Sequence, residues 1–346
     1  MNGRSLSRWA VPALTMVIAL GPGVAYAGGG DTVGGGDVGG QQQSKGKVKG
    51  NNLSVETKVQ TTVNGAPQSS AKTGTLTPAN SNWDPPACWY EPAYTPKQIE
   101  TTVKAIRSIP IFGIGEVVGT VFDSYYKDGH PYKNYNLDKQ GKGKFWAAAI
   151  AKGHEDDPAA KACDKPPFWV DDGEPPKEKL AVSPKILAEY AYGELPIPGT
   201  EVKLAPKGET KVNLPTWAWL DKAKFKKISV TASLPGTGLS ATTTAEPVSL
   251  KIDPGTGDAQ TFPASGVCPI EGGRIGEPYA KGKANQDPPC GVKYLRSSDN
   301  GSYKLKATVT WKVSWTSTTG EGDTLPDGEF GADQNVVVKE VQSVNR

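Results

Sequence analysis

Few side chains in this chain have types and spacings that could do chemistry. Its 346 residues include only two histidines, His130 and His154. The second opens the densest group of polar side chains, residues 154–157 (HEDD), and a further acidic group lies at residues 321–333. Divalent cations such as Ca²⁺ need hard oxygen ligands that converge on one point, and neither group has the spacing of a Ca²⁺-binding loop. We therefore expect no metal site and no cofactor, and interpret the groups as a charged helix end and a long solvated loop.

Two common hydrolase motifs do not occur in the sequence. It has neither the Gly-x-Ser-x-Gly elbow of serine hydrolases nor the His-Glu-x-x-His pattern of zinc proteases. Residues 113–119 (GIGEVVG) have one residue too many before the third glycine for a dinucleotide loop. We interpret them as close helix packing or a turn. Paired acids could serve a glycosidase, but with no catalytic residues to name, the sequence favours a protein that is not an enzyme.

Residues 234–238 (LPGTG) match the pentapeptide that sortases recognise. A sorting signal also needs a following apolar span and a basic tail, whereas strand-like sequence follows here. A strand that ends in a Pro-Gly turn explains the motif.

Aromatic side chains provide the clearest candidate for a binding surface. Tyrosines cluster around His130, and tryptophans occur in the same region of the chain. Amphipathic rings can stack on a sugar, and they also bury well in a small disulfide-linked unit. Both interpretations stay open at this point. The tentative binding face comprises Trp89, Tyr126, His130, Tyr132 and Tyr135.

The four cysteines, an even number, indicate disulfide bonds and an oxidising compartment. We favour pairing Cys88 with Cys163 and Cys268 with Cys290. The first two lie in a region rich in proline and tryptophan, and the other two lie in one rich in strands. A zinc site would show Cys-x-x-Cys or Cys/His clustering, which this sequence lacks. Loop-closure entropy predicts a stabilisation of ~3 kcal/mol from the shorter bridge and ~4–5 kcal/mol from the longer one.

The N-terminal segment predicts export. Basic residues precede an apolar run from Trp9 to Leu20, and Ala25-Tyr26-Ala27 has the form of a signal-peptide cleavage site. The run is too short to span about 30 Å of hydrocarbon, and no later apolar stretch approaches ~18 residues. We expect residues 1–27 to be a signal peptide and the mature protein to be secreted, in part wall-associated, without a membrane span.

Three parts are expected after the signal peptide. Residues 28–80, rich in glycine, lysine and threonine, form a flexible spacer with a candidate strand at 53–63. Residues 81–198 form a disulfide-stapled unit with helices. Residues 199–346 form a β-sandwich domain.

Two helix starts stand out in the 81–198 unit. Thr95 as N-cap, Pro96 in the first turn and Gln98 as capping-box partner begin a helix. Its apolar face comprises Ile99, Val103 and Ile106. Ser183-Pro184 begins another helix, and residues 145–151 are interpreted as a short buried one.

Strand signals dominate the C-terminal part. Apolar and polar residues alternate without a break from Tyr303 to Trp315, which is the period of a strand with one buried face. Further strands are expected at 201–204, 228–234, 248–252 and 336–344, with Pro-Gly and Asn-Gly turns between some of them. The predicted fold class is mainly β with a small α-containing N-terminal unit. The C-terminal domain is predicted to be an immunoglobulin-like β-sandwich or a related antiparallel β-fold.

Net charge argues against one class of partner. Lys and Arg (39) nearly balance Asp and Glu (36), whereas affinity for phosphate polymers needs concentrated positive charge. We therefore expect no nucleic acid. The expected partner is a cell-wall polymer or a secreted or surface protein.

Several segments together resemble a known type of protein. They are the signal peptide, the glycine-rich start of the mature chain, Cys88-Trp89-Tyr90, residues 212–217 (VNLPTW) and Cys290-Gly291-Val292. In these features the chain resembles uncharacterised secreted proteins of actinobacteria such as streptomycetes, over most of its mature length. Such proteins sometimes carry an enoyl-reductase label, against which the missing dinucleotide fingerprint and the export signal argue.

We therefore expect a secreted, non-enzymatic binding or structural protein that acts at the cell envelope or in an extracellular assembly. The alternative is a carbohydrate- or peptidoglycan-directed binding module or hydrolase.

Overall fold

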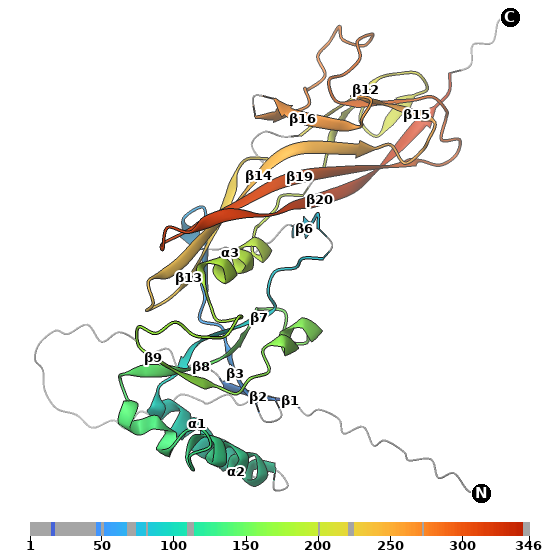
Figure 1. Ribbon diagram of the computed structural model, residues 1–346. Coiled ribbons are helices and arrows are strands. Elements are labelled where there is room, and N and C mark those ends of the chain that lie inside the picture. Colours follow the sequence, from blue (N-terminus) through green and yellow to red (C-terminus); the bar gives the residue numbers. More distant parts are fainter. Residues whose placement is uncertain are drawn as a thin grey trace, which may run out of the picture. The chain divides into compact units, whose positions relative to one another are not determined.

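The computed structural model describes residues 15–17, 46–49, 52–67, 74–80, 82–108, 114–199, 201–220, 225–271 and 273–341. The protein is mainly β, with 43% strand and 16% helix, as the sequence predicts (Figure 1). It divides into two compact units, and the chain passes between them more than once. Unit 1 comprises Met1–Lys58 and Pro86–Val182, and unit 2 comprises Val59–Pro85 and Ser183–Arg346. The predicted cleavage site and about half of the expected spacer lie outside the described residues.

Unit 1 contains one mixed sheet. Its strands are β1 (Thr15–Val17), β2 (Gly46–Lys49), β3 (Asn52–Glu56), β7 (Cys88–Tyr94), β8 (Gly143–Ile150) and β9 (Phe168–Asp171). The order is β1-β2-β3-β8-β7, and β9 also pairs with β8. Strand β7 occupies one edge of β8. Along the other edge, β8 pairs with β9 as far as Trp146 and with β3 from Ala148 onward.

The helix that we predicted at residues 145–151 is wrong, because these residues form most of β8. Phe145, Ala147 and Ala149 are fully buried on one face of the strand, and Ala148 is nearly so on the other. A strand buried on both faces has a continuous apolar sequence, which periodicity alone does not distinguish from a buried helix.

Two α-helices lie on one side of this sheet, α1 (Pro96–Arg107) and α2 (Ile114–Tyr126) (Figure 1). The predicted capping box of α1 is present: the Thr95 hydroxyl accepts from the Gln98 amide at 3.3 Å, and the Gln98 side chain accepts from the Thr95 amide at 2.8 Å. Helix α2 approaches α1 closely at Gly119, where a Cβ would lie 3.0 Å from the Cβ of Arg107. Close packing therefore explains at least this glycine of the 113–119 motif. Two short 3₁₀ helices, η1 (Asn134–Lys139) and η2 (Pro158–Ala162), complete the unit.

The described residues of unit 2 form two sheets and one helix, α3 (Pro184–Gly193). The large sheet has the order β11-β20-β19-β14-β13-β4-β5, joined by β6, β16 and β17, and the small one has the order β10-β12-β18-β15. The strands are β4 (Gln60–Val63), β5 (Ala66–Pro67), β6 (Thr77–Pro78), β10 (Lys203–Ala205), β11 (Glu209–Lys211), β12 (Thr216–Trp219), β13 (Ile228–Leu234), β14 (Leu239–Asp253), β15 (Ala259–Phe262), β16 (Val267–Glu271), β17 (Arg274–Ile275), β18 (Gly291–Tyr294), β19 (Tyr303–Ser317) and β20 (Gly322–Lys339).

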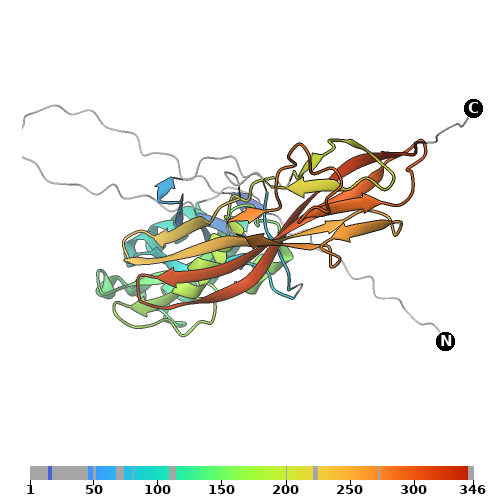
Figure 2. The same ribbon diagram turned by 90° about the horizontal axis from the view of Figure 1, so that it is seen from above.

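Three antiparallel strands, β14, β19 and β20, are the longest strands of the large sheet, and both ribbon views show them side by side (Figures 1 and 2). The predicted alternation in β19 is confirmed: Leu305, Val309 and Val313 are fully buried, and their neighbours are not. The residues of the LPGTG motif join β13 to β14 in a turn, where the Thr237 hydroxyl donates to the carbonyl oxygen of Leu234 at 2.7 Å.

The acidic segment 321–333 is not the solvated loop that we predicted. From Gly322 onward it pairs with β19 as part of β20. The sequence of this segment is typical of a loop because glycines and acids are poor strand formers. Within the described residues, only the short strands β6 and β11 pair with the other edge of β20. Charged side chains on such an edge disfavour pairing with a second chain.

The unit boundaries differ from the expected ones. Helix α3 packs on β13 and β14, and the Thr243 hydroxyl of β14 donates to the carbonyl oxygen of Ala188 at 2.7 Å. The boundary therefore falls at residue 182 instead of 198. The candidate strand at 53–63 is two strands, β3 in unit 1 and β4 in unit 2. Strand β2, expected to be spacer, pairs with β3.

Both disulfides form in the predicted pairing. Cys88 is bonded to Cys163 within unit 1, and Cys268 to Cys290 within unit 2. They indicate an oxidising environment. Among the described residues, no helix is long and apolar enough to cross a membrane.

The alternation in β14 makes a testable prediction for unit 2. Leu250→Ala should lower its free energy of unfolding by about 2–5 kcal/mol, because the Leu250 side chain is fully buried. Lys251→Ala, at the next position and exposed, should change it by less than about 0.5 kcal/mol. Chemical denaturation followed by tryptophan fluorescence measures both. Equal losses for the two variants would contradict the assigned faces of β14.

Candidate ligand-binding site

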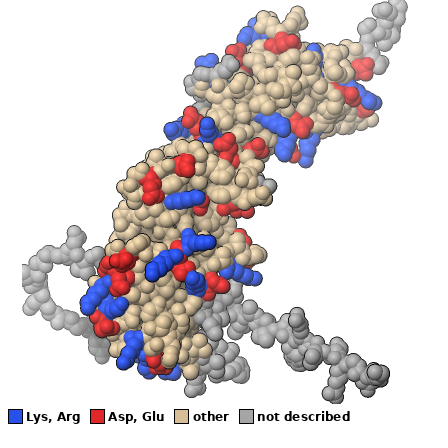
Figure 3. All heavy atoms as spheres, viewed as in Figure 1, with Lys and Arg blue, Asp and Glu red and all other residues tan. Residues whose placement is uncertain are grey.

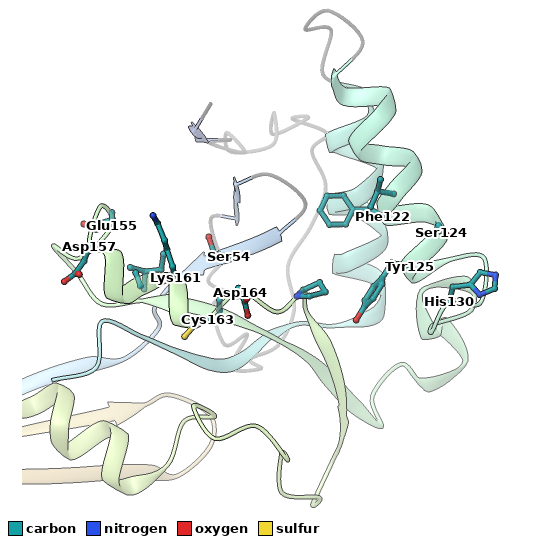
Figure 4. Close-up of a pocket in the computed structure, with 15 residues that line it drawn as sticks. Ser54, Phe122, Ser124, Tyr125, His130, Glu155, Asp157, Lys161, Cys163 and Asp164 are labelled. Carbon is teal, nitrogen blue, oxygen red and sulfur yellow. The ribbon is translucent and has the colours of Figure 1, made fainter. Parts of the chain in front are cut away.

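A cavity of about 680 Å³ lies in unit 1 beside the point where β8 changes partners. Its apolar wall comes from α2, through Phe122 and Tyr125, and its floor includes Ala148 of β8. The opposite, polar wall comes from the segment that includes η2, with Asp157, Lys161 and Asp164. Figure 4 shows Phe122 and Tyr125 on one side, and Asp157, Lys161 and Asp164 on the other.

The sheet explains why space exists here. Strands β3 and β9 share one edge of β8, and their pairing with it stops on either side of Ala147. Ser54, the first residue of β3 that pairs with β8, lines the cavity, and so does Pro166, which precedes β9. The side chain of Ala148 is only a methyl group, so it fills little of the space at the floor of the cavity.

Tyr125 is the half-buried aromatic residue of the site. Its ring packs edge-on against Tyr126, with 4.8 Å between centroids, and against Tyr132, with 5.6 Å. Burial raises the pKa of its hydroxyl, so the phenol stays protonated and can donate a hydrogen bond to a ligand.

The polar wall is held in shape by local bonds. The Asp157 carboxylate caps η2 by accepting from the amide of Ala159 at 2.8 Å, and it lies 3.0 Å from Nδ1 of His154. The hydrogen bond to His154 is the largest of the effects that lower the pKa of Asp157, so this carboxylate remains ionised. Lys161 and Asp164 are exposed, and within the described residues no ion pair joins Lys161 to a carboxylate.

Three connections hold this wall against the rest of unit 1. The Cys88–Cys163 disulfide joins it to β7. The amide of Lys165 donates to the Tyr90 hydroxyl at 3.1 Å, and the Tyr126 hydroxyl donates to the carbonyl oxygen of Pro167 at 3.0 Å. Lys165 also forms an ion pair with Glu178 at 2.7 Å.

The five residues of the predicted binding face do not share one exposed surface. Trp89, Tyr126 and Tyr135 are buried, with 0%, 0% and 4% of their surface exposed, and therefore cannot contact a ligand. Tyr132 is half-buried and stacks on Tyr126, with centroids 5.9 Å apart. His130 is exposed and lines the edge of the cavity, but its ring points away from the other labelled side chains (Figure 4). The burial of these three rings supports the alternative that they pack in the core. The polar group of each ring is hydrogen-bonded within unit 1.

Sequence reasoning missed most of the cavity. Phe122 and Tyr125 lie on α2 at a helical spacing of three, which a count of aromatic residues along 114–126 could have revealed. The polar residues of the η2 segment carry no such signal, because the fold alone brings them opposite α2. Within the described part of the chain, no three His, Cys, Asp or Glu side chains are grouped closely enough to hold a metal ion.

No protein-family model, no curated protein and no solved structure matches the chain.

Glu91 shows why Trp89 is structural. This fully buried carboxylate accepts from Nε1 of Trp89 at 2.9 Å, from the Thr57 hydroxyl at 3.0 Å and from the Lys58 amide at 2.8 Å. The bonds from Thr57 and Lys58 tie the segment that follows β3, the strand that carries Ser54, to β7, and the bond from Trp89 lies within β7. Burial raises the pKa of Glu91 and outweighs the hydrogen bonds and the nearby Lys58 ammonium, which lower it.

This pKa predicts a pH dependence of stability. A raised folded pKa means that the folded state holds the proton more tightly than the unfolded chain. The stabilising contribution is complete below the unfolded pKa of about 4.5 and is lost as the pH rises through the folded value. The difference in unfolding free energy between wild type and Glu91→Gln should therefore fall as the pH rises from 4.5, by about 1.4 kcal/mol for each pH unit that separates the folded from the unfolded pKa. Urea denaturation at a series of pH values, with Glu174→Gln as a surface control, measures it. A difference that stays constant or rises would refute this.

The disulfide predicts the stability of the cavity wall. Removing the bond between Cys88 and Cys163, 75 residues apart, with a Cys88→Ala/Cys163→Ala double variant should cost unit 1 ~4–5 kcal/mol. Trypsin should then cleave faster after Lys161 under native conditions. The matched variant Cys268→Ala/Cys290→Ala, with a separation of 22 residues, should cost unit 2 ~3 kcal/mol and leave that cleavage rate unchanged. Equal cleavage rates in both variants would show that the bridge does not hold this wall.

Proposed function

We propose that this protein is a secreted, non-enzymatic binding protein that holds a polysaccharide of the cell envelope in the cavity of unit 1. The observation that carries the proposal is the composition of that cavity: the half-buried ring of Tyr125 on one wall, and hydroxyl, carboxylate and ammonium groups around it. Its volume of about 680 Å³ falls in the range typical of ligand pockets.

The chemistry of a sugar suits this arrangement. A pyranose ring has an apolar face of C–H groups and an edge of hydroxyl groups. The half-buried Tyr125 ring would contact the face, while Asp157 and Asp164 accept from hydroxyl groups and Lys161 donates to them. The fixed polar wall would set the orientation of the sugar.

Several features support the proposed location. The two disulfides need an oxidising compartment, and the N-terminal sequence has the features of an export signal. We propose that the chain is of the same type as the secreted actinobacterial proteins that it resembles. On the face shown in Figure 3, acidic and basic side chains are interspersed, without the broad positive area that a phosphate polymer would need.

A hydrolase that acts on the same polymer is the second candidate, because Glu155, Asp157 and Asp164 bring three carboxylates to one cavity. A glycosidase needs one carboxyl that keeps its proton near neutral pH and one that is ionised. Asp157, with its lowered pKa, suits only the ionised role. Release of reducing ends from isolated cell wall, lost in Asp157→Asn, would favour this candidate over simple binding.

Co-sedimentation with isolated actinobacterial cell wall tests the proposed function. The mature chain with its disulfides intact should sediment with the wall, and soluble glycan fragments should compete. Binding should persist in about 1 M salt, where charge interactions are screened beyond about 3 Å.

Substitutions assign the binding to the cavity. Tyr125→Ala should weaken it about tenfold, equivalent to about 1.4 kcal/mol, and Lys161→Ala and Asp164→Asn should also weaken it. The controls Lys133→Ala and Asp138→Asn replace residues of unit 1 outside the cavity and should bind as wild type does. Failure of the wild-type chain to sediment, or equal losses in the controls, would overturn the proposal.

A further inference from the structure

A row of half-buried aromatic rings leads away from the cavity along unit 1. We name Tyr125, Tyr132 and Trp169 the aromatic ridge. Tyr125 lines the cavity and packs edge-on against Tyr132 at 5.6 Å. Tyr132 and Trp169 flank the buried Phe145, with centroid distances of 5.1 and 5.2 Å. All three ridge residues keep part of their surface exposed, and the ridge meets the cavity at Tyr125.

The rings of the ridge are fixed in place. The Tyr132 hydroxyl accepts from the backbone amide of Trp169 at 2.9 Å, which also blocks part of the outer edge of β9. The indole N–H of Trp169 donates to the Asp171 carboxylate at 2.8 Å. Gly143 leaves room for the indole, because a Cβ there would lie 2.7 Å from the Cζ2 atom of Trp169. Preorganised rings lose little conformational entropy when a ligand binds.

Polar groups border the far end of the ridge. The ammonium of Lys139 lies 5.7 Å from the centre of the Trp169 ring and 3.5 Å from the Asp171 carboxylate. Trp169 therefore has a hydrogen-bond donor, Lys139, and an acceptor, Asp171, beside its ring, which is the same combination of groups as in the cavity. The cavity and the ridge are connected at two points of the chain. Pro166 lines the cavity and lies three positions before Trp169 of β9, and Tyr125 of α2 belongs to both the cavity and the ridge.

We propose that the ligand of unit 1 is an extended glycan strand, which occupies the cavity with one sugar and continues over Tyr125 along Tyr132 and Trp169. The proposal rests on the proposed function and specifies its ligand: a polymer of several sugar units instead of a single one. A linear glycan repeats the same apolar face and hydroxyl edge along its length, and the ridge repeats the matching aromatic and polar groups.

Binding of glycans of different lengths tests this. The probes are the disaccharide repeat of peptidoglycan and glycan strands several repeats long, each freed of its peptides. Wild type should bind the long strands about tenfold more tightly than the disaccharide. Trp169→Ala should remove that advantage and leave the affinity for the disaccharide within about twofold of wild type. The matched control Trp83→Ala removes a half-buried tryptophan of unit 2 and should change neither affinity.

Each other result has a defined meaning. If wild type binds both probes equally, or if Trp169→Ala weakens both to the same extent, the ridge is not a subsite, although the cavity can still bind. If wild type binds neither probe, the proposed function fails as well. Preferential binding of a proline-rich peptide, which also docks on aromatic grooves, would replace the glycan as ligand.

A second measurement does not depend on the folding of a variant. Hydroxyl-radical footprinting of the wild-type chain should show protection of the peptide that contains Trp169 by the long strands but not by the disaccharide. Tyr125 should be protected by both probes. Trp169 oxidised at the same rate with and without the long strands would overturn the proposal.

Discussion

Unit 1 depends on the burial of β8 on both faces and on both edges. Strand β7 takes one edge, β3 and β9 divide the other, and the alanines at the centre keep both faces close to their neighbours. A single strand on the second edge would have closed the sheet. Because two strands share that edge and diverge, the sheet opens next to Ala148, and α2 and the η2 segment border the opening. The candidate site is thus a consequence of how one strand satisfies its backbone hydrogen bonds.

Unit 2 rests on a different constraint, the long pairing of β14, β19 and β20. Strands of this length keep their register only if each buried side chain stays on its own face, since a slip of one residue would expose the whole apolar set. The alternation in β19 enforces that register, and bulges at Pro247 and Trp311 absorb the irregularities. The exposed glycines and acids of β20 then contribute little to packing, and they suit a strand at the side of the sheet.

Local signals in the sequence predicted the parts of the fold that depend on neighbouring residues. The capping box at Thr95, the alternation from Tyr303 to Trp315 and the turn at Pro235-Gly236 involve residues a few positions apart, and each is present. The errors fall where distant segments decide the outcome. Strand β8 has a helix-like sequence because neighbours on both sides bury it, and β20 has a loop-like sequence because its partner β19 supplies the apolar face. The cavity combines residues from Ser54 to Pro166, and no spacing along the chain reveals it. The aromatic count around His130 selected mainly the rings that form the core of unit 1.

The polar wall of the cavity is held in place mainly by a disulfide bond, which forms under oxidising conditions. Helix η2 has no buried residue, and its Ala160 packs, partly buried, against the cluster of Cys88, Tyr90, Ala148 and Cys163. Its strongest tether is the covalent bond from Cys163 to Cys88, supported by the hydrogen bond between Lys165 and Tyr90 and the ion pair between Lys165 and Glu178. The ion pair is exposed, and exposed pairs contribute only about 0–1 kcal/mol. The disulfide, by contrast, limits the freedom of the whole loop. A cavity whose polar wall depends on such a bond keeps its shape only where thiols are oxidised. The same bond that stabilises unit 1 therefore makes the geometry of the cavity depend on an oxidising environment.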